Sequence, residues 1–92
     1  MQEENVSEVD LKEYVPYALF TYSIVHLEQK DKVRFYYDLK GRDGQSGIMK
    51  ACRIEQLGRT VLLVPKDQES AVEQFLKKWN CKSGRRLVWA AR

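Results

Sequence analysis

The chain has 92 residues, of which 43% are hydrophobic and 11% are aromatic, and its net charge is +3. This composition excludes an intrinsically disordered chain, and the length allows a single domain with a modest core. No apolar run approaches the ~18–20 residues that a membrane-spanning helix requires, and no basic-then-apolar leader begins the sequence. We therefore expect an intracellular protein, cytoplasmic or nuclear, that does not enter a membrane.

The charge is unevenly distributed along the chain. Residues 1–13 hold five acids and one lysine, a net charge of −4, which leaves +7 on residues 14–92. The segment from Lys77 to Arg92 contains six cations and no acid. We divide the chain into an acidic N-terminal tail, 1–13, and a single domain, 14–92. Separated charge of this kind favours an anionic partner, although a solvated basic surface gives the same composition.

Two strands are predicted in the first half of the domain. Residues 17–28 are rich in β-branched and aromatic side chains, which predicts a strand with both faces partly covered, in the middle of a sheet. The polar residues 28–31 then fit a hairpin turn. In residues 32–39, apolar side chains at odd positions alternate with polar or amphipathic ones at even positions. Side chains alternate faces along a strand, so this pattern predicts a half-buried strand paired with the first.

A glycine-rich loop over residues 40–47 precedes the least certain segment. Residues 48–55 fit either a strand or a short helix that Gly58 ends, and the loop before them favours the strand, as in a second hairpin. The continuous apolar run of residues 60–64 predicts a fully buried strand.

An amphipathic helix is predicted over residues 67–79, with Asp67 as its N-cap and lysines at its C-terminal end. Its apolar positions form one face: Ala71, Val72, Phe75, Leu76 and Trp79. Residues 87–91 return to the sheet as a short strand. The predicted fold class is α+β, a small antiparallel sheet of four to five strands with one C-terminal helix packed on one face, in the order β-β-β-β-α-β. This layout is similar in outline to single-strand-binding coactivator-type domains, but no motif matches residue by residue and no family is assigned.

Metal and cofactor sites are not expected. Cys52 and Cys81 are far apart and the chain has one histidine, His26, whereas structural zinc usually takes four Cys or His ligands at short spacings. A Cys52–Cys81 disulfide could form, but buried free thiols are expected inside a cell. The glycine-rich loop matches neither the Walker nor the dinucleotide pattern. We therefore assign no catalytic residue and no cofactor, and interpret His26 as structural.

The pattern most informative about function is a set of cations beside an aromatic residue. Strand alternation would place Lys32, Arg34 and Tyr36 on one outer face, where a base could stack while its phosphates are neutralised. Further candidate phosphate contacts are Arg42 in the loop, Lys50 after it, and Arg85 and Arg86 before the last strand. We therefore predict a nucleic-acid-binding domain for single-stranded DNA or RNA.

Two alternatives stay open. The same face could bind a protein, as in a small inhibitor or subunit, or a second copy of the chain in a homodimer. The triplet from Glu28 to Lys30 has the Glu-x-Lys spacing of metal-dependent nucleases, which need a second acid, here Asp10 or Asp38.

Overall fold

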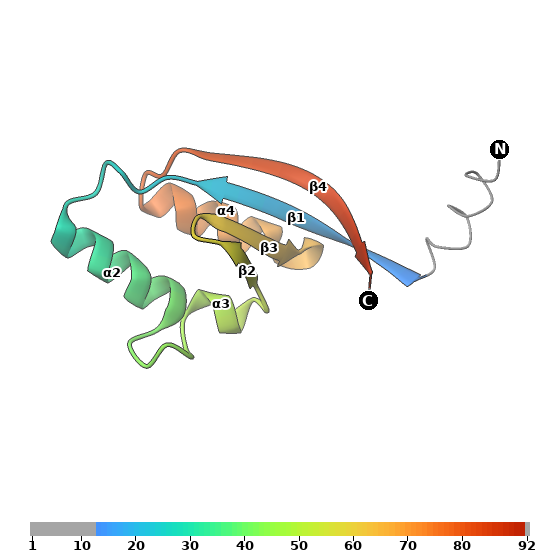
Figure 1. Ribbon diagram of the computed structural model, residues 1–92, viewed down its shortest axis with the longest axis horizontal. Helices are drawn as coiled ribbons and strands as arrows, with labels where there is room; N and C mark the ends of the chain where they lie inside the picture. Colours follow the sequence, from blue (N-terminus) through green and yellow to red (C-terminus); the bar gives the residue numbers. More distant parts are fainter. Residues whose placement is uncertain (1–12, 92) are drawn as a thin grey trace.

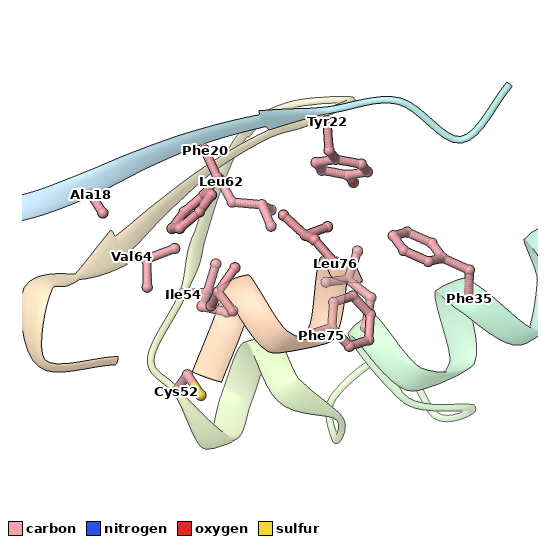
Figure 2. Packing of buried hydrophobic residues seen from close by; sticks show 12 residues of the cluster. Ala18, Phe20, Tyr22, Phe35, Cys52, Ile54, Leu62, Val64, Phe75 and Leu76 are labelled. Atoms are coloured by element: carbon pink, nitrogen blue, oxygen red, sulfur yellow. The ribbon is translucent and has the colours of Figure 1, made fainter. Parts of the chain in front are cut away.

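The computed structural model describes residues 13–91, so Arg92 and nearly all of the predicted acidic tail lie outside the described residues. The elements in chain order are β1 (Tyr14–Tyr22), α2 (Gln29–Lys40), α3 (Ile48–Ala51), β2 (Glu55–Gly58), β3 (Val61–Pro65), the 3-10 turn η2 (Lys66–Gln68), α4 (Glu69–Lys78) and β4 (Ser83–Ala91). The four strands form one antiparallel sheet in the order β2-β3-β1-β4. Figures 1 and 2 show α2, α3 and α4 on the same side of this sheet.

Each helical connection joins two strands that have another strand between them. The segment with α2 and α3 connects β1 to β2 across β3, and α4 connects β3 to β4 across β1. This is the split β-α-β arrangement of ferredoxin-like folds. The predicted α+β class with an antiparallel sheet is confirmed. The predicted order β-β-β-β-α-β is wrong, and so is the strand meander before the helix.

The predicted strand at residues 32–39 is instead the middle of α2. Phe35 and Leu39 are fully buried, whereas Val33 and Tyr37 are 41% and 42% exposed. Residues four apart lie on one face in both a helix and a strand, but residues two apart share a face only in a strand. The exposure of Val33 and Tyr37 is therefore consistent with a helix and inconsistent with a half-buried strand.

The start of α2 falls where a hairpin turn is predicted. Glu28 is the N-cap residue, and the N–H groups of Asp31 and Lys32 both donate to its carbonyl at 2.9 Å. Asp31 also complements the positive N-terminal end of the helix dipole. β1 consequently ends at Tyr22 and pairs with β3 and β4, not with residues 32–39.

Residues 48–55 begin with the short helix α3 and not with the favoured strand. The N–H of Cys52 donates to the carbonyl of Ile48 at 2.9 Å. Arg53 then adopts a left-handed φ of 56°, after which β2 begins. The strand prediction was wrong because Ile48 and Cys52 are four residues apart and would share a face in either a strand or a helix, so their pattern does not distinguish the two.

The later elements match the predictions more closely. The apolar run at 60–64 corresponds to β3, which lies between β2 and β1 as expected. The strand is not fully buried as predicted, because only Leu62 and Val64 are buried, whereas Val61 and Leu63 are half-buried on the face without helices. The helix predicted over 67–79 is α4, which begins later because η2 precedes it. The N-cap of α4 is Gln68 and not the predicted Asp67, which lies in η2. The Asp67 carboxylate instead forms an ion pair with Arg53 at 3.2 Å. β4 is longer than predicted and has nine residues.

The core lies between the sheet and the helices, as Figure 2 shows. β1 and β3 contribute alternate residues: Ala18, Phe20, Tyr22, Leu62 and Val64. α2 and α4 contribute one face each: Phe35, Leu39, Val72, Phe75 and Leu76. Burial of each large apolar side chain stabilises the fold by roughly 1.5–3 kcal/mol.

Both cysteines are free, with Cys52 buried in the core and Cys81 half-buried beside it. Burial raises the pKa of the Cys81 thiol. Within residues 13–91, no helix is long and apolar enough to cross a membrane. The same residues contain no cluster of three His, Cys, Asp or Glu side chains that could hold a metal ion.

Candidate nucleic-acid interface

The helical form of α2 changes which of the predicted site residues share a face. Lys32, Tyr36 and Lys40 are spaced by four and form one stripe along the helix. The Lys40 ammonium lies over the Tyr36 ring, 5.6 Å from its centroid. Arg34 is two residues from both Lys32 and Tyr36, about 200° around the helix, so it lies on the opposite side. The strand face predicted for Lys32, Arg34 and Tyr36 together does not exist.

One side of this stripe borders a pocket of about 600 Å³. The pocket is lined by residues from the end of β1, from α2 and from the β2–β3 turn: Tyr22, Ser23, Ile24, Val25, Lys32, Tyr36, Arg59 and Thr60. Lys32 and Arg59 give it two positive charges, and no carboxylate is among these lining residues. Its electrostatic character therefore suits an anion.

Tyr22 contributes a hydroxyl that stays protonated at this pocket. The hydroxyl donates to the carbonyl of Arg59 at 3.3 Å, which ties the end of β1 to the β2–β3 turn. Burial, with smaller contributions from Tyr36 and Cys81, raises the pKa of Tyr22 to about 12. The pocket therefore holds a neutral phenol next to its two cations.

A second pocket of about 380 Å³ lies beside the C-terminal end of the stripe. It is lined by Lys40, Gly44, Gln45, Ser46, Met49, Lys50, Ile54 and Gln56. This lining again has two cations, Lys40 and Lys50, and no carboxylate.

The loop that borders the second pocket joins α2 to α3, so it is not the connection of a second hairpin, and hydrogen bonds to a side chain fix its backbone. Asp43 Oδ1 accepts hydrogen bonds from the N–H groups of Gln45 and Ser46, both at 2.9 Å, and from Ser46 Oγ at 3.0 Å. The bond from Gln45, followed by those from Ser46, holds the pKa of Asp43 below its usual value. Gly47 has a φ of +107°, and a Cβ there would lie 2.7 Å from the backbone nitrogen of Gly41.

Two contacts join the pockets into one surface. Lys40, from the second pocket, lies over Tyr36 of the first. Gln56, also from the second pocket, donates from Nε2 to the carbonyl of Arg59 at 3.2 Å. We call this surface the α2–β2 groove and define it by its polar and charged residues: Tyr22, Lys32, Tyr36, Lys40, Lys50, Gln56 and Arg59. None of its four cations has an ion pair within residues 13–91.

Three of the predicted site residues, Lys32, Tyr36 and Lys50, thus lie in the α2–β2 groove, and two others on the far side of α2 do not. Arg34 is exposed on that side. The Arg42 guanidinium lies 5.0 Å from the ring centroid of Tyr37 and is held there.

The two arginines of β4 are also remote from the groove. Arg85 pairs with Glu69 at 2.6 Å, and Lys66 together with Arg85 holds the pKa of Glu69 below its usual value. Arg86 is opposite Leu19 of β1 and lies on the sheet face away from the helices. That face is largely apolar, with Val15, Tyr17, Leu19, Val61, Leu63 and Val88, so the predicted basic sheet face is wrong.

The sequence analysis missed four residues of the groove: Tyr22, Lys40, Gln56 and Arg59. Lys40 continues the four-residue spacing of Lys32 and Tyr36, a signal that appears only once the segment is read as a helix. Arg59 sits in the tight turn between β2 and β3, and no local pattern links that turn to α2.

The residues considered for catalysis have structural contacts instead. His26 Nε2 is 2.8 Å from the carbonyl of Trp79, and because a carbonyl only accepts, Nε2 carries the proton. Glu28 and Asp38 stand at opposite ends of α2, about 15 Å apart at 1.5 Å per residue, and cannot share one metal ion. Asp38 pairs with Lys78 at 3.5 Å, and Asp10 lies outside the described residues.

A scan against protein-family models found no match, and neither did searches of curated proteins and of solved structures. The fold alone does not identify an activity, because ferredoxin-like topology serves many unrelated functions. The chemistry of the α2–β2 groove must therefore indicate the function.

Proposed function

We propose that the protein binds single-stranded nucleic acid, DNA or RNA, in the α2–β2 groove. The observation that carries this proposal is the convergence of four cations and two tyrosines on two adjoining pockets whose lining residues include no carboxylate. The larger pocket, at about 600 Å³, falls within the range of about 300–1,000 Å³ typical of small-ligand sites. A base with its phosphates matches this combination of ring surface and positive charge.

The stripe on α2 suits a strand that runs along the helix. Lys32 and Lys40 are eight residues apart, about 12 Å along the axis, so they would contact different phosphates. Tyr36 lies between them, and a base that stacks on its ring would displace the Lys40 ammonium toward a phosphate. Such stacking contributes ~1–3 kcal/mol per base and needs no particular sequence.

The concave shape of the site favours an unpaired strand over a duplex. Duplex DNA is usually recognised by an element that projects into the major groove. Here the cations line hollows between α2 and the β2–β3 hairpin. Unpaired bases can enter such hollows, whereas stacked and paired bases cannot.

The test is a fluorescence-anisotropy titration of the 92-residue chain with labelled oligo(dT) and oligo(U) across a range of salt concentrations. Four phosphate contacts predict a slope of log K against log[salt] of about −3, since each contributes about −0.7 for a single strand. Lys40→Gln should weaken binding roughly tenfold, because one charge-assisted contact is worth about 1.5 kcal/mol, and should make the slope shallower by about 0.7.

Arg34→Gln is the matched control, because it removes the same charge from the opposite side of the same helix. We expect it to weaken binding less than about twofold, through long-range electrostatics alone. Equal losses for Lys40→Gln and Arg34→Gln would contradict the α2–β2 groove as the site. An affinity that does not depend on salt would contradict phosphate binding altogether.

A further inference from the structure

The two edges of the sheet differ in a way that the α2–β2 groove does not explain. β2, at one edge, has four residues and an irregular register between Gln56 and Gly58. β4, at the other edge, has nine residues in continuous register with β1 and contains no proline. A long regular edge with free backbone groups is a template for another strand, and short or irregular edges are protected from such pairing.

The hydrogen bonds between β1 and β4 identify which residues of β4 direct their backbone N–H and C=O groups away from the sheet. The N–H of Ser23 donates to the carbonyl of Lys82 at 3.0 Å, so even-numbered residues of β4 bond to β1. The odd-numbered residues therefore direct their N–H and C=O groups away from the sheet: Ser83, Arg85, Leu87, Trp89 and Ala91. Within residues 13–91 no strand pairs with this edge.

The same odd-numbered residues carry exposed apolar side chains. Leu87 and Trp89 are 52% and 51% exposed, and Tyr14, opposite Ala91, is 37% exposed on the same face. Figure 1 shows that β1 and β4 extend together beyond β2 and β3. The register places Trp89 and Ala91 in this extension, opposite the part of β1 that has no partner in β3. Exposed apolar side chains beside free backbone groups mark an interaction surface.

We propose that β4 pairs with β4 of a second copy of the chain, antiparallel, about a two-fold axis at Leu87. This register overlaps all nine residues and bonds odd-numbered residues to odd-numbered residues. It places Arg85 opposite the partner's Trp89 and Arg86 opposite the partner's Val88. The basic first half of the strand thereby meets the apolar second half of its partner.

The distribution of charge in β4 favours this register over those centred on its arginines, and full overlap of the nine residues favours it over those centred further along the strand. Centring the axis on Arg85 or Arg86 would place two arginines directly opposite each other, which is unfavourable. In the Leu87 register Arg85 meets an indole, a favourable cation–π partner, while Glu69 keeps it neutralised at 2.6 Å. The strand is thus complementary to itself in the two-fold arrangement that homodimers commonly use.

Sedimentation equilibrium of the chain at several concentrations tests the proposal. We expect a dimer of the 10.8 kDa chain. Leu87→Glu places two carboxylates at the axis and should raise the dimer dissociation constant at least tenfold. Leu57→Glu is the matched control, since Leu57 is 53% exposed on the opposite edge strand, and it should leave the dimer intact. Circular dichroism checks that both variants keep the fold.

A cross-linking variant tests the register without depending on destabilisation. Directly hydrogen-bonded residues on antiparallel strands have Cα atoms about 5.5 Å apart, within the range of about 4.4–6.8 Å that a disulfide accepts. Leu87→Cys should therefore form a covalent dimer under mild oxidation, whereas Leu57→Cys should not. A chain that is monomeric at every concentration overturns the proposal, and so does a dimer that Leu87→Glu leaves intact.

Discussion

Tyr22 links the hydrophobic core to the α2–β2 groove. Its ring lies 5.6 Å from that of Phe35 in the core, and its hydroxyl donates to Arg59 at the groove. The pKa of Tyr22 is about 12 in the folded protein and about 10 in the unfolded chain. Between these two pH values the hydroxyl is protonated in the folded protein and ionised in the unfolded chain.

This difference predicts a loss of stability in alkali. The contribution of Tyr22 is fully present below its unfolded pKa and is lost as pH rises through its folded pKa. The difference in unfolding free energy between wild type and Tyr22→Phe should shift by about 1 kcal/mol against wild type between about pH 9 and about pH 11. Urea denaturation of both proteins at each pH measures it, and a difference that stays constant with pH would contradict a buried phenol.

At the scale of the element, α2 shows where sequence reasoning stops. A strand and a helix both predict that Phe35 and Leu39 are buried, because the two residues are four apart. Only Val33 and Tyr37 distinguish the two elements, since a strand would bury them and a helix exposes them. Both are apolar or aromatic, so their side chains do not indicate that they are exposed. Their exposure is set by where the sheet lies relative to α2, which is a tertiary property. β3 and α4 were predictable because a five-residue apolar run and a ten-residue amphipathic pattern each fit one element type.

The same comparison explains the partial success at the site. Lys32 and Tyr36 are four residues apart and share a face in a strand and in a helix, so the prediction that they lie together is correct. Arg34 is two residues from each, so it shares their face only in a strand. Arg59 reaches α2 only through the order of the strands in the sheet, which no local pattern encodes.

Substitution at two positions of α2 distinguishes the helix from the strand in solution. Phe35 contacts the rings of Tyr22, Tyr36, Phe75 and Trp79, with centroids 5.3–5.7 Å apart. Phe35→Ala should reduce the unfolding free energy by about 3–5 kcal/mol, as for other buried phenylalanines. Tyr37→Ala, on the exposed side, should cost less than about 1 kcal/mol. Guanidinium denaturation measures both, and similar losses would favour the strand.

At the scale of the whole molecule, the described domain and the acidic N-terminal residues carry opposite charge. Removing residues 1–13 raises the net charge of the chain from +3 to +7. If the domain binds a polyanion, this change should strengthen binding, because net charge steers association over long range.

The deletion is therefore expected to increase oligonucleotide affinity severalfold at low salt and to have little effect near about 0.5 M salt, where screening is strong. Replacing the tail acids Glu3, Glu4, Glu8 and Asp10 with their amides is the control that keeps the length of the chain. If neither change alters affinity at low salt, the acidic segment plays no part in binding.

The sheet order has one more consequence, for the valency of binding. β4 and β2, the strand that borders the α2–β2 groove, are at opposite edges of the sheet, so pairing through β4 would leave two grooves on one eight-stranded sheet, with the two β2 strands roughly 35 Å apart at ~4.8 Å per strand. Because the two-fold axis stands perpendicular to the sheet, both grooves would open on the same side. An oligonucleotide long enough to bridge them would gain avidity through a high effective concentration, and a shorter one would bind each site independently.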